Sequence, residues 1–136
     1  MAKGKIWVQR PSKQPKPKIL PLDKTAIQHT AVLFIDSELS PFCMKPPAKG
    51  DDSSYIVDIY SKWHGVYLYF CSKYRCPAEN CMSEFFEDKF VRIEYIENNL
   101  FNLAYKRHTG QWWELYRELS LEQCLRIIKE DPNFQP

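Results

Sequence analysis

The chain has 136 residues, of which 44% are hydrophobic and 15% are aromatic. This length and composition predict one folded globular domain and exclude an intrinsically disordered protein. The longest apolar run, residues 31–35, is too short to span a bilayer, and the N-terminus lacks the apolar segment of a secretory signal. We therefore expect a cytoplasmic protein that does not contact a membrane.

The charge is unevenly distributed, although the net charge is only +2. Residues 1–20 hold six bases and no acid, whereas the rest of the chain holds 13 bases and 17 acids, a net charge of −4. Four prolines between positions 11 and 21 prevent a regular helix there and favour an extended path. We therefore expect a basic arm at residues 1–21 and a single domain at residues 22–136. The candidate contacts within the arm are Trp7, Lys13, Lys16 and Lys18, which suit either nucleic acid or an acidic protein surface.

Residues 23–39 predict a helix, because apolar side chains recur at helical spacing between Ile27 and Leu39. Asp23 is the expected N-cap, and Pro41 is expected to end the helix. Residues 41–54 are rich in Pro, Lys, Gly and Asp, which predicts a loop.

A series of short strands follows the loop. The pattern predicts strands over residues 55–60, 66–71, 90–96, 101–107 and 111–116, with an irregular connection over 72–84. Asparagines at 98 and 99 mark a hairpin turn, because asparagine tolerates a positive φ. Ser120 and Gln123 match a capping box that opens a helix over 121–130.

The order of these elements predicts the fold class. A helix, four or five strands joined by short turns, and a second helix predict an α+β fold with an antiparallel sheet. Both helices are expected on one face of this sheet. The opposite face is then the candidate working surface.

Aromatic and basic residues alternate in two segments that fall on the predicted strands and turns. This combination holds single-stranded nucleic acid by base stacking, and it also occurs in protein interfaces and in half-buried sheets. Trp112 and Trp113 should occupy opposite faces of the last strand, so we expect at least one of them in the core. The candidate contact residues are Tyr67, Tyr69, Lys73, Arg75, Arg107, Trp112 and Trp113.

Three cysteines follow a C-x4-C-x4-C pattern, with a histidine upstream. Cys71, Cys76 and Cys81 with His64 could hold zinc, but the close C-x2-C pair of most structural zinc sites is missing. Five cysteines cannot all pair within one chain, so free thiols are the simplest interpretation. We therefore expect no cofactor, with zinc at these four residues as the alternative.

The sequence offers little for catalysis. Cys71 with His64 or His108 is the one nucleophile–base pair that can be constructed, and no nucleophile motif flanks these residues. The chain has four glycines and no phosphate-binding loop. We therefore expect that the protein is not an enzyme and has no small-molecule substrate.

The sequence resembles a family of small bacterial proteins of unknown function. Four runs carry the resemblance, namely YIVDIYSKWHGVYLYFCSKYRCP, EFFEDKFVRIEY, NLAYKRHTGQWWELY and LSLEQCLRIIKEDPNFQP. The resemblance covers most of the chain and is closest over residues 55–136. It implies a stand-alone α+β unit and carries over no catalytic or binding residue.

Together these observations favour a small non-enzymatic binding or accessory protein. A protein partner is preferred to nucleic acid, because the net acidic body would repel a polyphosphate outside the arm. The alternatives are a nucleic-acid-binding protein that uses the arm and the aromatic sheet face, and a zinc or thiol protein that uses the cysteines.

Overall fold

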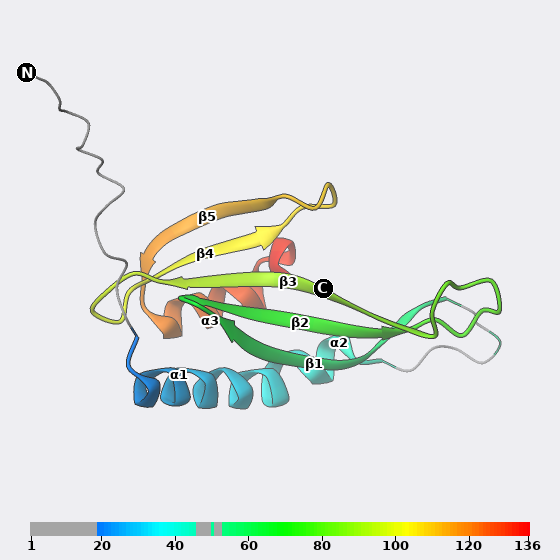
Figure 1. The fold of residues 1–136 in the computed structure, drawn as a ribbon, viewed down its shortest axis with the longest axis horizontal. Helices are drawn as coiled ribbons and strands as arrows, with labels where there is room; N and C mark the ends of the chain where they lie inside the picture. The colour runs from blue at the N-terminus through cyan, green and yellow to red at the C-terminus, as the bar shows by residue number, and fades with distance from the viewer. Residues whose placement is uncertain (1–18, 46–49, 51–52) are drawn as a thin grey trace, which may run out of the picture.

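The computed structural model describes residues 19–45, 50 and 53–136, and it shows helices packed against a five-stranded antiparallel sheet (Figure 1). The predicted α+β fold is confirmed. The helical elements are α1 (Pro21–Phe34), a π-helical segment (Ile35–Leu39), α2 (Ser40–Cys43), α3 (Leu121–Glu130) and a 3-10 turn (Pro132–Phe134). The strands are β1 (Tyr55–His64), β2 (Tyr67–Arg75), β3 (Phe85–Tyr95), β4 (Phe101–Lys106) and β5 (Trp112–Leu119).

The strands form a meander in which each strand pairs with the next one along the chain. Short turns make this order possible, and the β3–β4 turn holds Asn98 and Asn99 at φ values of 51° and 60°, as expected. Helices α1 and α3 cover one face of the sheet and share one hydrophobic core with it (Figure 1). The largest fully buried side chains of this core are Phe70, Phe101, Phe134, Ile35, Leu68, Ile93, Leu103 and Ile128.

Strand β3 contains a bulge at Phe90. Phe70 of β2 pairs with Val91, but the next residue, Cys71, pairs with Lys89, so Phe90 has no partner on β2. A bulge places two consecutive side chains opposite one residue of the neighbouring strand. Phe90 and Val91 are accordingly both buried, and the Phe90 ring packs against the Phe70 ring with the two ring centroids 6.4 Å apart.

The N-terminal helix differs from its prediction at both ends. It begins at Pro21 and has no side-chain cap, and Asp23 lies in the first turn, where a negative charge suits the positive end of the helix dipole. Pro41 does not end the helix. The π-helical segment shifts the hydrogen-bond pattern, and Pro41 then falls in the first turn of α2, where the missing N–H costs no hydrogen bond.

The predicted irregular connection over 72–84 is also partly wrong. β2 continues to Arg75 and β3 begins at Phe85, so the connection shrinks to residues 76–84. Charged and aromatic pairs extend this hairpin, with Lys73 opposite Glu87 and the Tyr74 ring stacked on the Phe86 ring at 4.8 Å. The sequence did not predict these strand ends, because their many polar residues break the apolar alternation that indicates a strand.

The C-terminal helix forms as predicted. The Ser120 hydroxyl accepts a hydrogen bond from the Gln123 N–H at 3.2 Å, and the Gln123 side chain accepts one from the Ser120 N–H at 2.9 Å. Cys124, Leu125 and Ile128 face the core. Among the described residues, no helix is long and apolar enough to cross a membrane.

Replacing Phe134 with alanine tests how much the chain end contributes to the core. The Phe134 ring is fully buried, and its centroid lies 5.5 Å from that of the Tyr105 ring and 6.1 Å from that of the Tyr116 ring. Loss of this ring should lower the free energy of unfolding by about 3–5 kcal/mol, measured by urea denaturation. Met82→Ala, at a fully exposed side chain, is the control and should change it by less than about 0.5 kcal/mol. Equal effects of the two substitutions would contradict the assigned packing.

Candidate functional site

The face of the sheet that the helices leave uncovered carries a row of large polar and aromatic side chains. On β2, Leu68 and Phe70 point to the helices, so Tyr67 and Tyr69 point away from them. Arg92 of β3 pairs with Tyr69 across the sheet and shares its face. We call this surface the helix-free face.

Four side chains from three strands form an arginine–aromatic cluster on the helix-free face, namely Tyr67, Tyr69, Arg92 and Trp112. The Tyr69 ring lies 6.0 Å from the Tyr67 ring and 5.7 Å from the Trp112 ring. The Arg92 guanidinium carbon lies 5.0 Å from the Tyr67 ring centroid and 5.3 Å from that of Trp112. The guanidinium is therefore held by two aromatic rings through cation–π contacts.

The Arg92 guanidinium has unused hydrogen-bonding capacity. Its Nε is buried and has no hydrogen-bond partner within the described part of the chain. A buried donor without an acceptor is costly, and such groups are rare in folded proteins. The cluster therefore combines partly exposed aromatic rings with an arginine that forms no ion pair with a carboxylate in the described structure.

Charges of both signs surround the cluster. The Lys89 ammonium lies 4.6 Å from the Tyr69 ring centroid, and Lys62 pairs with Tyr69 from β1. A neighbouring cavity of about 400 Å³ contains an ion pair between Asp88 and Lys106 at 2.5 Å. The full lining of this cavity is Tyr60, Lys62, Cys71, Glu87, Asp88, Lys89 and Lys106, in which Tyr60 donates a hydrogen bond to Glu87.

Both tryptophans of β5 lie outside the core. Trp112 is half-buried in the cluster, whereas Trp113 lies on the other face, 47% exposed, with the Arg107 guanidinium 4.7 Å from its ring. The prediction that one of them belongs to the core is therefore wrong. β5 is an edge strand, and the fully buried Phe134 packs beside Tyr116 further along it.

The structure gathers only some of the predicted contact residues. Tyr67, Tyr69 and Trp112 meet in the cluster, but Arg107 and Trp113 do not join it. Lys73 and Arg75 lie near the far end of the β2–β3 hairpin, and Trp7, Lys13, Lys16 and Lys18 lie outside the described residues. Arg92 is a candidate functional residue that was not predicted. Its signal in the sequence is a charge between two residues that are buried, Val91 and Ile93.

Lys73 and Arg75 have other contacts at the hairpin end. The Lys73 ammonium lies 4.9 Å from the Phe85 ring centroid. Arg75 forms an ion pair with Glu84 at 3.1 Å and donates a hydrogen bond to the Tyr55 hydroxyl at 3.2 Å. The hydrogen bonds to Tyr55 and Glu84 raise the pKa of the exposed Arg75 guanidinium.

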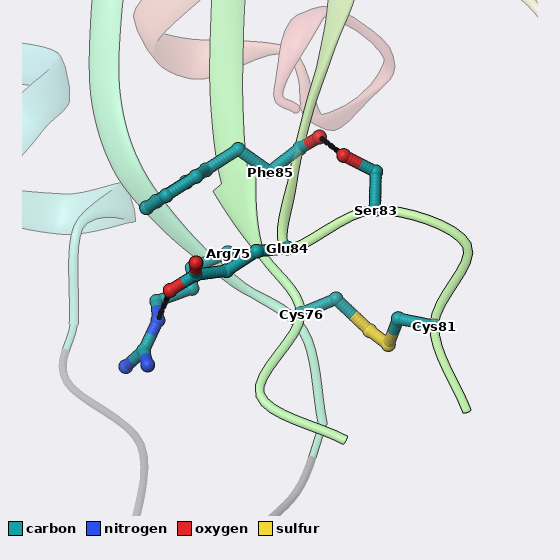
Figure 2. Close-up of a disulfide and its surroundings, with 6 residues drawn as sticks. All are labelled: Arg75, Cys76, Cys81, Ser83, Glu84 and Phe85. Carbon is teal, nitrogen blue, oxygen red and sulfur yellow. Dashed lines mark hydrogen bonds and ion pairs between the residues drawn. A yellow bond between two sulfur atoms is a disulfide. The ribbon is translucent and has the colours of Figure 1, made fainter. Parts of the chain in front are cut away.

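The cysteines do not converge. Cys76 and Cys81 form a disulfide, which shows that the expectation of free thiols is wrong for this pair (Figure 2). Cys71 is buried within β2, and His64 pairs with Tyr67 at the opposite end of the hairpin from Cys76. Within the described ranges, no group of three or more His, Cys, Asp or Glu side chains is placed to hold a metal ion.

The three remaining cysteines, Cys43, Cys71 and Cys124, are free thiols with raised pKa values. Burial raises the pKa of the Cys124 thiol to about 12. Burial also raises the pKa of Cys71, although Lys62 and Lys89 act in the opposite direction. A raised pKa lowers the thiolate fraction at neutral pH, and the thiolate is the nucleophile.

Alkylation with iodoacetamide at neutral pH tests these thiols. Cys71 and Cys124 should react more slowly than a small-molecule thiol, with partly exposed Cys43 ahead of both, and the rates should rise as the pH is raised. Peptide mass spectrometry after timed quenching measures each rate. Rapid labelling of Cys71 at neutral pH would instead identify an activated nucleophile.

A family model matches residues 20–136 of the chain. The chain belongs to the family described as a domain of unknown function (DUF3024). Comparison with curated proteins and comparison with solved structures both found no match. Membership of DUF3024 confirms the resemblance to a family of unknown function, and it assigns no activity to the arginine–aromatic cluster.

Proposed function

We propose that this DUF3024 protein is a non-enzymatic binding protein that contacts a protein partner through the arginine–aromatic cluster. The observation that carries the proposal is the position of Arg92, held by the rings of Tyr67 and Trp112 on the helix-free face. Trp, Tyr and Arg are the residues that most often dominate the binding energy of protein interfaces. A guanidinium already fixed by two rings loses little conformational entropy on binding.

The charges near the cluster favour a protein over nucleic acid. Lys62 and Lys89 lie beside it, but Glu94 pairs with Tyr67 and Glu114 lies two residues from Trp112. A polyphosphate would meet these carboxylates, whereas a protein surface can present charges of both signs. The rings of Tyr67, Tyr69 and Trp112 each have a cation over them already, which leaves less ring area for base stacking.

Single-stranded nucleic acid is the second candidate. Lys62 and Lys89 flank the Tyr69 ring, and the basic arm supplies further positive charge. Aromatic platforms beside cations are the usual means of holding single strands. The two candidates differ in their dependence on salt, because contacts to phosphates release counterions.

The proposal needs neither a metal nor a catalytic residue. Zinc binding at Cys71, Cys76, Cys81 and His64 would require reduction of the Cys76–Cys81 disulfide and a rearrangement of β2. Catalysis by Cys71 would require a base, but Cys71 pairs with Tyr60 across β1, whereas His64 pairs with Tyr67 at the turn between the two strands.

The two tryptophans of β5 provide a matched pair of variants. Chemical crosslinking of the full chain in extract from the native host identifies the partner, and calorimetry then measures its affinity. Trp112→Ala should weaken binding by about tenfold or more, as expected for an interface hot spot. Trp113→Ala, on the other face of the same strand, should change the affinity by less than about twofold. Equal losses for the two variants would refute the assignment of the cluster.

Fluorescence anisotropy with labelled mixed-sequence single-stranded DNA and RNA tests the second candidate. We expect no saturable binding of the full chain at physiological salt, because the cluster is surrounded by both signs of charge. The control is the full chain with Lys13, Lys16 and Lys18 replaced by glutamine. Salt-dependent binding that these three substitutions weaken would support nucleic acid and count against the protein partner.

A further inference from the structure

The connection between β2 and β3 carries a disulfide that lies outside the hydrophobic core. Cys76 and Cys81 are bonded across the four residues between them, and neither belongs to the core cluster (Figure 2). Both residues are partly exposed. Met82, which follows the disulfide directly, is fully exposed. A reductant in solution can therefore approach this bond without unfolding the sheet.

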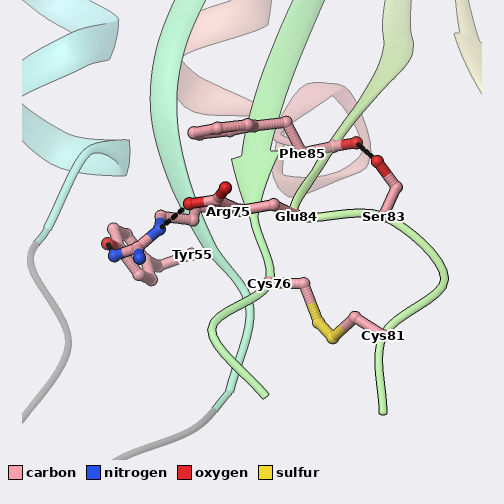
Figure 3. A network of polar contacts seen from close by, with 7 residues as sticks. All are labelled: Tyr55, Arg75, Cys76, Cys81, Ser83, Glu84 and Phe85. Atoms are coloured by element: carbon pink, nitrogen blue, oxygen red, sulfur yellow. Dashed lines mark hydrogen bonds and ion pairs between the residues drawn. A yellow bond between two sulfur atoms is a disulfide. The ribbon is translucent and has the colours of Figure 1, made fainter. Parts of the chain in front are cut away.

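The base of the hairpin is held without the disulfide. The Cys76 N–H donates a hydrogen bond to the Glu84 carbonyl at 2.7 Å. Figure 3 shows the ion pair between Arg75 and the Glu84 carboxylate, at 3.1 Å. Arg75 also donates to Tyr55 of β1, and the Ser83 hydroxyl donates to the Phe85 carbonyl at 2.8 Å. We call the contacts of Glu84 with Cys76 and Arg75 the Glu84 clamp. The strand pairs Tyr74–Phe86 and Arg75–Phe85 extend the backbone pairing of β2 and β3 up to this clamp.

The disulfide itself closes only a short segment. Residues 77–80 lie between the two cysteines, and one backbone hydrogen bond, from Cys81 to Ala78 at 3.3 Å, is found inside this segment. Opening the disulfide therefore releases residues 77–82 while the clamp at Glu84 keeps β2 and β3 paired. A covalent bond that the sheet does not need, placed where solvent reaches it, suits a reversible reaction better than a structural role.

We propose that Cys76–Cys81 is a reversible thiol–disulfide exchange site whose co-reactant is a dithiol reductant. One thiolate of the dithiol attacks the Cys81 sulfur, the Cys76–Cys81 bond breaks, and Cys76 leaves as a thiolate that takes a proton from water. The second thiol of the reductant then attacks the reductant's first sulfur, which is bonded to Cys81 in the mixed disulfide. This step releases the Cys81 thiolate, which is protonated in turn. Two electrons pass to the protein, and the dithiol becomes a disulfide.

Cys81 is the sulfur attacked because it lies in the segment that can move. Cys76 is fixed by the hydrogen bond to Glu84 and by the adjacent Arg75, whereas Cys81 is outside the clamp. Reduction also changes how the end of the hairpin is presented. Met82, Phe85 and Phe86 are exposed apolar side chains there, with Phe85 and Phe86 on the strand side of the clamp. This site is separate from the arginine–aromatic cluster and does not depend on the proposed partner.

The rate of reduction decides between an exchange site and a structural disulfide. The full chain, purified without reductant, is treated with dithiothreitol in native buffer and in urea, quenched by alkylation and mapped by mass spectrometry. We expect the native rate to lie within about tenfold of the rate in urea, because access needs no unfolding. A bond that opens only on global unfolding would react more slowly by about 10³-fold or more, and this result would overturn the proposal.

Glutathione provides a second, site-specific measurement. In buffers of reduced and oxidised glutathione, the mixed disulfide should form on Cys81 in preference to Cys76, while buried Cys71 and Cys124 remain unmodified. The Cys76→Ser/Cys81→Ser variant should keep the urea denaturation midpoint close to that of the disulfide-bonded parent, because the contacts of Glu84 hold the hairpin without the bond. Preferential modification of Cys76, or failure of oxidised glutathione to restore the Cys76–Cys81 bond after reduction, would contradict the proposal.

Discussion

The bulge at Phe90 is the constraint on which both faces of the sheet depend. In a regular strand, Lys89 and Arg92 would lie on opposite faces, because they are three residues apart. The bulge places Phe90 and Val91 together in the core and brings Lys89 and Arg92 to the same helix-free face. One unpaired residue in β3 therefore determines both the packing beneath the sheet and the charge of the candidate surface above it.

Helix packing explains why only one face is available. Helices α1 and α3 and the buried Phe134 fill a single core against one side of the sheet, and α1 is fastened to β1 by side-chain hydrogen bonds. The Gln28 amide donates to the Ser61 carbonyl at 2.9 Å, and the Trp63 indole donates to the Lys24 carbonyl at 3.2 Å. With this side closed, aromatic residues on the other side pack against one another and against cations. The result is a half-exposed cluster rather than a second core.

Much of the fold could be predicted from local patterns in the sequence. Alternating residues, the two asparagines of the β3–β4 turn and the capping box at Ser120 each reflect a local interaction. The turn and the C-terminal helix formed as expected, and the five strands formed with different ends. The full length of the β2–β3 hairpin was not predictable in this way, because its end is stabilised by cross-strand pairs such as Tyr74 with Phe86. The π-helical segment before Pro41 likewise has no local signal in the sequence.

The candidate site was predictable only in part. Tyr67, Tyr69 and Trp112 were identified from their aromatic and basic surroundings, but the sequence could not show that they meet across three strands. Arg92 was missed because its position depends on the register of β3 with β2 and on the bulge beside it. The Cys76–Cys81 pair depends on the path of the loop, which spacing alone does not fix.

The most direct test of the arginine–aromatic cluster is the NMR signal of the Arg92 Nε–H group in full-length protein labelled with ¹⁵N-arginine. Two rings beside the guanidinium should shift this proton upfield, and burial of Nε should slow its exchange with water, so that it stays visible at neutral pH. Both effects should weaken in Trp112→Ala, in which the Tyr67 ring alone remains beside the guanidinium, and persist in full in Trp113→Ala. A rapidly exchanging signal at the position of a free arginine would contradict the cluster and the binding surface built on it.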